Sequence, residues 1–134
     1  MNSLKKETAH DIYFGGGGPL EVFFRPRNAA VIAFDASVML PDHPEGKPIG
    51  VARWMGSDQG PPELSITVID AYQGKGVGTR LMDALLALAR KRGVRRIIAD
   101  VLRENTGLRT LVNRYRSVVQ RSGDPLVVRY RIDV

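Results

Sequence analysis

The sequence predicts an α/β (α+β) domain in which a mixed central sheet is flanked by helices. Two apolar segments, 64–69 and 97–101, enclose an amphipathic segment, and this order is typical of two parallel strands joined by a helix. The other apolar segments are separated by loops rich in proline and glycine, which favours antiparallel hairpins. The chain has 134 residues, which suits one domain with one core.

The N-terminal part is predicted to begin with a flexible segment, residues 1–19, followed by a single domain at 20–134. The first segment is polar and then glycine-rich, and the run of four glycines at 15–18 stabilises no regular structure. Residues 20–25 are predicted to form a short strand, and residues 29–40 a buried one.

The middle of the chain is predicted to contain a hairpin and then a buried strand. Residues 41–48 are dense in turn formers and separate the strand before them from a strand at 49–55. Residues 64–69 are nearly all apolar, and strands without alternation are usually buried on both faces. We therefore expect helices on both faces of the sheet at this point.

Two helices and a closing hairpin are predicted for the C-terminal half. From residue 79 to 92 apolar residues recur at helical spacing, and Gly93 is the expected stop. A second helix is expected at 107–115, capped by Asn105 and Thr106, and a hairpin at 118–134.

The composition excludes several classes of site. Cysteine is absent, which excludes a disulfide scaffold, a thiolate zinc site and a cysteine nucleophile. His10 and His43 are too few and too far apart to suggest a metal site, so no metal is expected. No apolar run is long enough to cross a bilayer, and residues 1–7 lack the apolar core of a secretory signal. We therefore expect a cytoplasmic protein without a membrane partner.

The net charge of +6 is interpreted as attraction of an anionic ligand or as solubility. The basic residues around Gly93 complement the dipole at the end of a helix, and this explanation is favoured over a nucleic-acid patch. No aromatic residues lie between these charges, which further argues against a nucleic-acid partner. The residues in question are Lys91, Arg92, Arg95 and Arg96.

The most informative segment, residues 63–79, reads as a strand, a glycine-rich turn and the start of a helix. Such a turn presents free backbone N–H groups at the positive end of a helix dipole and is a ready site for phosphate. A P-loop is excluded because no Gly-Lys-Ser/Thr follows the required gap. The dinucleotide signature also fails in either glycine register, although Asp100 lies near the end of the next strand.

The pattern that fits is Gln-x-x-Gly-x-Gly, written here as Gln73-Gly-Lys-Gly-Val-Gly78. This segment resembles the acetyl-coenzyme A pyrophosphate loop of the GNAT N-acetyltransferases. The match extends from about Ile49 to the C-terminus, because strand, loop, helix, strand, Asn105, helix and hairpin follow the order of that family. Within the family the chain is most similar to bacterial protein-lysine acetyltransferase domains.

The resemblance implies how acetyl-coenzyme A would bind. The glycine turn would enclose the pyrophosphate, and the pantetheine arm would pair with the open edge of the strand at 66–68, in a gap where the two parallel strands splay apart. Asn105 would contact the cofactor, a role compatible with capping a helix. The implied cofactor-binding residues are Ile66, Thr67, Val68, Gln73, Gly74, Lys75, Gly76, Val77, Gly78, Thr79 and Asn105.

The resemblance also implies catalytic roles. Glu63 stands where many of these enzymes keep a catalytic glutamate, although a solvated strand end is the alternative. The backbone N–H near Val68 would stabilise a developing oxyanion. Many relatives carry a tyrosine seven residues after the asparagine, but that position is Val112 here. Tyr115 is a substitute candidate for the general acid, with packing as the favoured alternative.

The N-terminal third departs from the family, because no amphipathic helix is evident before residue 49. The acceptor site would then be open, completed by another subunit as in a homodimer, or absent. The leading hypothesis is an acetyl-coenzyme A-dependent N-acetyltransferase acting on a primary amine, either a small molecule or a protein lysine. The alternatives are a non-catalytic acyl-coenzyme A-binding module and, more weakly, a nicotinamide-dinucleotide binder.

Overall fold

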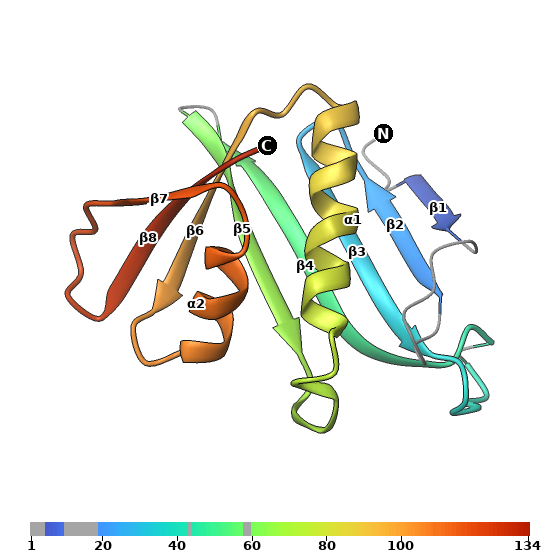
Figure 1. The fold of residues 1–134 in the computed structure, drawn as a ribbon. Helices are drawn as coiled ribbons and strands as arrows, with labels where there is room; N and C mark the ends of the chain where they lie inside the picture. Colours follow the sequence, from blue (N-terminus) through green and yellow to red (C-terminus); the bar gives the residue numbers. More distant parts are fainter. Residues whose placement is uncertain (1–4, 10–18, 43, 58–59) are drawn as a thin grey trace.

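The computed structural model describes residues 5–9, 19–42, 44–57 and 60–134. Within these residues, eight strands form one sheet in the order β1-β2-β3-β4-β5-β6-β8-β7 (Figure 1). All neighbours are antiparallel except β5 and β6. The elements are β1 Lys5–Ala9, β2 Leu20–Phe24, β3 Asn28–Asp35, β4 Lys47–Ser57, β5 Gly60–Val68, a 3-10 turn Asp70–Tyr72, α1 Val77–Lys91, β6 Arg96–Leu102, α2 Thr106–Asn113, β7 Ser117–Gln120 and β8 Val127–Asp133.

The N-terminal strands agree with the sequence except at their ends. The strand predicted from residue 20 and the hairpin that joins β3 to β4 are confirmed. Strand β3 ends at Asp35 instead of residue 40, because the Asp35 carboxylate accepts the backbone N–H of Ser37 and turns the chain. Strand β1 adds to β2 within the segment that the sequence assigned to a flexible N-terminus. The glycine run at 15–18 lies outside the described residues.

The predicted strand–helix–strand unit is confirmed, and its two strands are parallel over a short distance only. The pairing of β5 with β6 comprises Glu63 with Ile98 and Leu64 with Ala99. Beyond Leu64 the strands separate, as Figure 1 shows for the green and light-brown arrows. The sheet therefore contains the splayed parallel pair that the resemblance implied.

Helix α1 supplies most of the side chains that cover the central strands. Its buried residues recur at helical spacing and pack against β3, β4 and β5. It ends where Gly93 adopts a φ of 74° and Val94 N–H donates to the carbonyl of Ala89 at 2.9 Å, which confirms the predicted stop. None of the helices in the described part of the chain is long and apolar enough to cross a membrane.

The expectation that residues 64–69 are buried on both faces is wrong. Leu64 is buried, but Glu63, Ser65 and Thr67 are exposed and alternate with it. Both helices lie in front of the sheet in Figure 1, and the described residues place no helix behind it. The outward-facing side of β5 therefore meets no second layer, and its apolar composition alone did not indicate this.

The one-sided core makes a stability prediction. Leu85 on α1 is fully buried, so Leu85→Ala should lower the free energy of unfolding by about 2–5 kcal/mol through lost burial and a cavity. The matched control is Leu126→Ala, because Leu126 is 69% exposed, and we expect a change within about 0.5 kcal/mol. Urea denaturation measures both. Equal effects of the two substitutions would contradict the assigned core.

Candidate active site

A cleft opens where β5 and β6 separate. The backbone N–H of Ile69 donates to the carbonyl of Ile49 on β4 at 3.0 Å. This hydrogen bond shows which residues of β5 direct their backbone groups toward β4. Backbone groups of an antiparallel strand point alternately to its two sides, so those of Ile66 and Val68 point away from β4 and toward the opening. Since pairing with β6 stops at Leu64, no described strand supplies partners for these groups.

The turn after β5 leads into α1 with its donors exposed. Gly74 and Gly76 have φ values of 74° and 85°, and nothing described lies within 4 Å of a Cβ built on either residue. Gly76 precedes the first turn of α1 and offers no side chain to cap it. The first N–H groups of α1 consequently have no intrahelical acceptor and carry the positive end of the helix dipole.

Side-chain hydrogen bonds stabilise the turn between β5 and α1. The amide of Gln73 donates to the carbonyl of Val68 at 3.0 Å and to Asp70 at 3.2 Å. The hydroxyl of Tyr72 donates to the carboxylate of Asp35. This hydrogen bond is the main cause that raises the pKa of Tyr72, whereas the hydrogen bond from the Ser37 side chain, followed by that from Tyr72, lowers the pKa of Asp35.

Helix α2 forms the opposite wall. Asn105 caps it by accepting the N–H of Leu108 at 3.1 Å, so the predicted capping role is confirmed. The guanidinium of Arg114, just after α2, donates to the hydroxyl of Thr79 at 3.2 Å and joins the two walls. A Cβ at Gly78 would lie 3.1 Å from the side chain of Leu111, so the two walls approach closely at this glycine.

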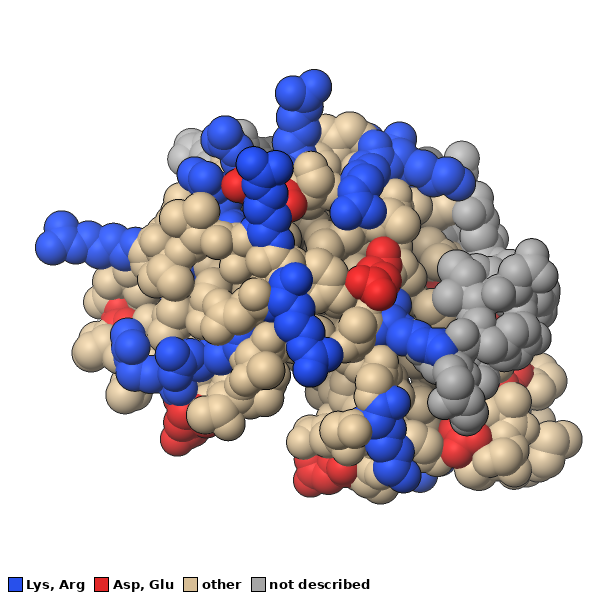
Figure 2. All heavy atoms as spheres, in the orientation of Figure 1, with Lys and Arg blue, Asp and Glu red and all other residues tan. Residues whose placement is uncertain are grey.

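The resulting cleft has a volume of about 600 Å³, within the usual range for ligand pockets. In Figure 2 the surface is hollowed along its lower edge, between α2 and the turn before α1. The residues that line the cleft are Ile66, Thr67, Val68, Tyr72, Gln73, Gly74, Gly76, Gly78, Thr79, Asn105, Thr106, Gly107, Leu108, Thr110, Leu111 and Arg114.

Most of the expected cofactor residues thus meet in one cleft, with two exceptions. Val77 is buried in the core, and the ammonium of Lys75 lies 5.5 Å from the centre of the Tyr72 ring. The sequence reading missed Tyr72 and the α2 wall beyond Asn105. The signal for the wall was present, because positions 107, 111 and 114 recur at helical spacing on one face.

Glu63 lies on the other face of the sheet from the helices. It is exposed, occupies one of the two positions at which β5 still pairs with β6, and does not line the cleft. Beside it, Arg129 donates to Asp100 through two hydrogen bonds of 2.8 and 2.9 Å. Asp100 is the main cause that raises the pKa of Arg129, and Glu63 adds to the effect, so the three charges are neighbours.

Tyr115 is held against α1. Its hydroxyl lies 2.6 Å from the carboxylate of Asp83 and 3.1 Å from the carbonyl of Thr79. Burial, followed by the hydrogen bond to Asp83, raises the pKa of Tyr115 far above that of a free tyrosine. Val112, at the position where many relatives carry tyrosine, is fully buried. These contacts favour an anchoring role for Tyr115.

The donor set of the cleft fits a phosphorylated thioester carrier. The uncapped N–H groups of α1 suit a diphosphate, and the open glycine positions leave room for it. The backbone groups of Ile66 and the N–H of Val68, which no described strand pairs, suit the amides of an extended arm. The chemistry of the cleft therefore fits coenzyme A.

Comparisons with known proteins agree with this geometry. A family model described as the acetyltransferase (GNAT) family matches residues 11–115. The chain is 42% identical over 72 residues to acetyltransferase Pat of Mycolicibacterium smegmatis, a match that covers 54% of this chain and 21% of Pat.

Two solved structures are similar as well. The GNAT domain of S. lividans PAT has a TM-score of 0.65 and 26% identity, covering 81% of this chain and 61% of that one. A cAMP-binding acyltransferase from Mycobacterium smegmatis has a TM-score of 0.66 and 29% identity, covering 81% and 32%. The chain thus spans less than two thirds of each of these relatives. Because the family model covers most of the chain, the chain belongs to the GNAT family of acetyltransferases.

Proposed function

We propose that this domain is an acetyl-coenzyme A-dependent N-acetyltransferase that acts on a primary amine. The observation that carries the proposal is the opening between β5 and β6. On the helix side of the sheet it leads to a cleft with phosphate-type donors. On the other side an exposed carboxylate, Glu63, stands at the point where the strands part.

Each part of the cleft has a role in holding the cofactor. The N–H groups at the start of α1 would face the diphosphate, and the backbone of Ile66 and Val68 would pair with the pantetheine arm. Asn105, already oriented by its bond to Leu108, would face the cofactor from the opposite wall. When bound, acetyl-coenzyme A supplies the acetyl group as a thioester.

Glu63 would prepare the amine. Free lysine has a pKa of about 10.4, so near neutral pH a proton must leave before the nitrogen can attack. A carboxylate on the outer face can accept that proton where the acceptor arrives, while the cleft holds the carrier on the inner face. The neighbouring pair of Asp100 and Arg129 keeps this part of the surface polar.

The open outer face favours an amine carried by a macromolecule. Glu63, Ser65 and Thr67 are all exposed, and a small amine usually needs an enclosing pocket for affinity. A protein lysine can instead obtain affinity from the surface around it. The resemblance of the sequence to bacterial protein-lysine acetyltransferase domains supports the same acceptor class.

The second candidate is a non-catalytic module that binds acyl-coenzyme A. It is favoured by one observation, the absence of a free tyrosine hydroxyl at the family position, because Val112 stands there and Tyr115 is bound to Asp83. A thiol-release assay across protein lysines, peptides and small amines, run beside a coenzyme A titration, separates the two. Binding without thiol release from any acceptor would support the module and contradict the enzyme.

The two ends of α1 provide a matched test of the glycine turn. Gly76→Ala and Gly93→Ala place a side chain at φ values of 85° and 74°, so each should cost about 1–2 kcal/mol of stability. Only Gly76 lines the cleft. Calorimetry should show the Kd for coenzyme A rising about tenfold or more in Gly76→Ala and little in Gly93→Ala. If both substitutions weakened coenzyme A binding equally, strain in α1 and not the glycine turn would set the affinity for coenzyme A.

The base assignment predicts a purely kinetic defect. Glu63→Gln should lower kcat roughly 100-fold or more, because proton transfer is lost, and should leave the Kd for coenzyme A unchanged. Glu104→Gln is the control, since it makes the same change on an exposed turn outside the cleft lining. Steady-state thiol release and calorimetry provide the two readouts. Normal turnover by Glu63→Gln would remove this residue from the mechanism.

The contacts of Tyr115 predict a pH-dependent stability effect. Tyr115→Phe should lower the free energy of unfolding by about 1 kcal/mol at pH 8, where the tyrosine is neutral in both states. An unfolded tyrosine ionises near pH 10, whereas folded Tyr115 keeps its proton to higher pH, so this stabilisation is lost as the pH rises. Urea denaturation should show that the free energies of unfolding of the wild type and Tyr115→Phe differ less at pH 11 than at pH 8. A large fall in kcat with unchanged stability would instead indicate a general acid.

A further inference from the structure

A second hollow lies on the side of α2 that faces away from the cofactor cleft. It has a volume of about 440 Å³ and is bordered by α2, the turn before it and the β7–β8 hairpin. Its lining is Arg103, Arg109, Asn113, Val119, Gln120, Arg121, Ser122, Asp124, Pro125, Val127, Val128 and Tyr130. None of these residues lines the first cleft, so the two sites share α2 as a wall without overlapping.

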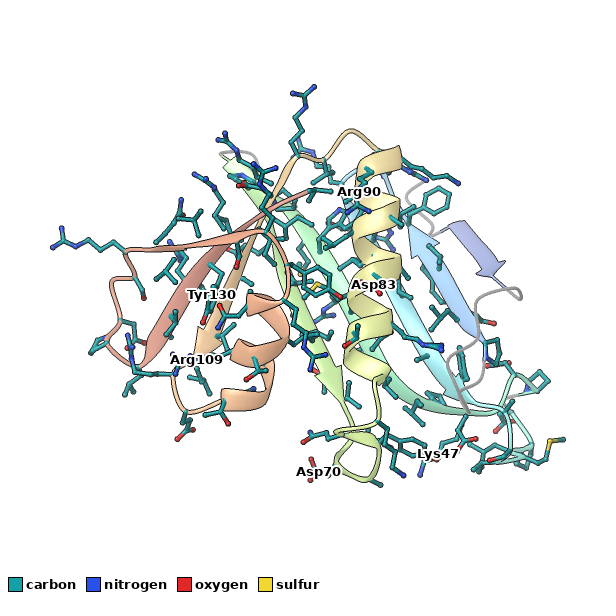
Figure 3. All side chains as sticks on the ribbon, viewed as in Figure 1. Lys47, Asp70, Asp83, Arg90, Arg109 and Tyr130 are labelled. Atoms are coloured by element: carbon teal, nitrogen blue, oxygen red, sulfur yellow. The ribbon has the colours of Figure 1, made fainter. Side chains whose placement is uncertain are left out.

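The helical period explains why α2 serves two sites. Leu108 and Leu111 point toward the cleft, whereas Arg109 and Asn113, four residues apart, line the hollow. Figure 3 shows Arg109 leaving α2 on the side away from α1, with Tyr130 nearby on β8. A charged residue is thus directed at the sheet, where an amphipathic helix would ordinarily place an apolar one.

The guanidinium of Arg109 is only partly satisfied. One terminal nitrogen, Nη1, donates to the carbonyl of Arg103 at 3.0 Å, which fixes the side chain in place. Its Nε is buried, and the described part of the chain offers it no acceptor. A buried donor on a charged group is costly when nothing accepts from it, so this guanidinium retains unused hydrogen-bonding capacity beside the hollow.

Other donors surround the same space. Arg103 is held by a 3.1 Å bond from its Nε to the carbonyl of Pro125, which leaves its terminal nitrogens available. Arg121 makes no hydrogen bond or ion pair with the described residues. Tyr130 is only 2% exposed and lines the hollow, and within the described ranges its hydroxyl has no partner.

The charge balance of the lining is strongly positive. Three arginines face one acidic residue, Asp124, and the carboxylate of Asp124 already accepts the backbone N–H of Leu126 at 2.9 Å. Guanidinium groups bind planar or tetrahedral oxyanions through paired N–H donors. The side chain of Asn113 can supply a further neutral donor, whereas the hydroxyl of Ser122 already donates to the carbonyl of Asp124 at 3.1 Å.

We propose that this hollow binds a phosphate group, either as inorganic phosphate or as part of a small phosphomonoester. The terminal nitrogens of Arg103, Arg109 and Arg121 donate to its oxygens, and the Tyr130 hydroxyl completes the site. The volume exceeds that of phosphate alone and leaves room for a small organic group. The site is separate from the cofactor cleft and does not depend on the proposed acetyl transfer.

The direct test is a titration of the full chain with inorganic phosphate. The readout is the set of Arg Nε–Hε signals in 1H–15N NMR spectra. Chloride holds the ionic strength constant, so general screening is removed. The amide signals of Gly76 and Gly78 report phosphate at the cofactor cleft, and a repeat with excess coenzyme A blocks that cleft. We expect the Arg109 Nε–Hε signal to shift and saturate in both titrations.

Variants assign the site. Arg121→Gln should raise the phosphate Kd about tenfold, the usual scale for loss of one charged hydrogen bond, and should not unfold the chain because this side chain is exposed. Arg109→Gln should weaken binding at least as much. Arg90→Gln removes the same charge from an exposed position on α1 and should leave the Kd unchanged. An Arg109 signal that chloride shifts equally, or equal weakening by Arg121→Gln and Arg90→Gln, would overturn the proposal.

A second ligand distinguishes the source of the phosphate. Glycerol 3-phosphate is titrated in the same way, with the same variants. Tighter binding than inorganic phosphate, lost in Arg121→Gln, supports a phosphomonoester whose organic part fills the hollow. Equal or weaker binding supports free phosphate. Failure of both ligands to saturate the Arg109 signal would refute the site, whatever the outcome of the thiol-release assay.

Discussion

The separation of β5 from β6 is the constraint on which the rest of the site depends. Strand pairing normally satisfies every backbone group in the middle of a sheet, and unpaired groups away from water are costly. Here pairing with β6 stops at Leu64, so the backbone groups of Ile66 and the N–H of Val68 face an opening instead of a neighbouring strand, while the carbonyl of Val68 accepts the amide of Gln73. The turn that follows adds the unsatisfied N–H groups of α1 at the same end of the opening. The chain thus leaves a continuous line of unused hydrogen-bonding capacity, which an extended phosphorylated carrier can satisfy.

The one-sided helix layer explains how this opening is supported and where chemistry can occur. Helix α1 packs on β3, β4 and β5 and holds the turn, while α2 is fastened to α1 through Tyr115 and Arg114. The cleft therefore opens on the helix side of the sheet. The opposite face carries Glu63 at the point where the strands part, with no described helix in front of it. In the proposed function, the two faces of one sheet separate cofactor binding from acceptor binding.

Sequence patterns predicted the helices and strands well, but they predicted the burial and the tertiary contacts of these elements less well. The period change at residue 79, the stop at Gly93 and the glycine turn indicated the strand–helix–strand unit because each has a local cause. The burial of residues 64–69 was misjudged, since the same apolar composition suits one covered face or two, and the number of layers depends on other segments. Tyr72 was missed because its partner, Asp35, is far away in sequence. Arg109 was not predicted as a site residue, because its position beside the hollow depends on which side of α2 faces the sheet.

Amide hydrogen exchange along β5 tests the central claim most directly. In the free protein, Ser65 and Thr67 should be protected by β4, whereas Ile66 and Val68 should exchange rapidly because no strand pairs with them. Addition of coenzyme A should slow exchange at Ile66 and Val68 and leave their two neighbours nearly unchanged. Protection of Ile66 and Val68 before coenzyme A is added, or no change after it, would contradict the account.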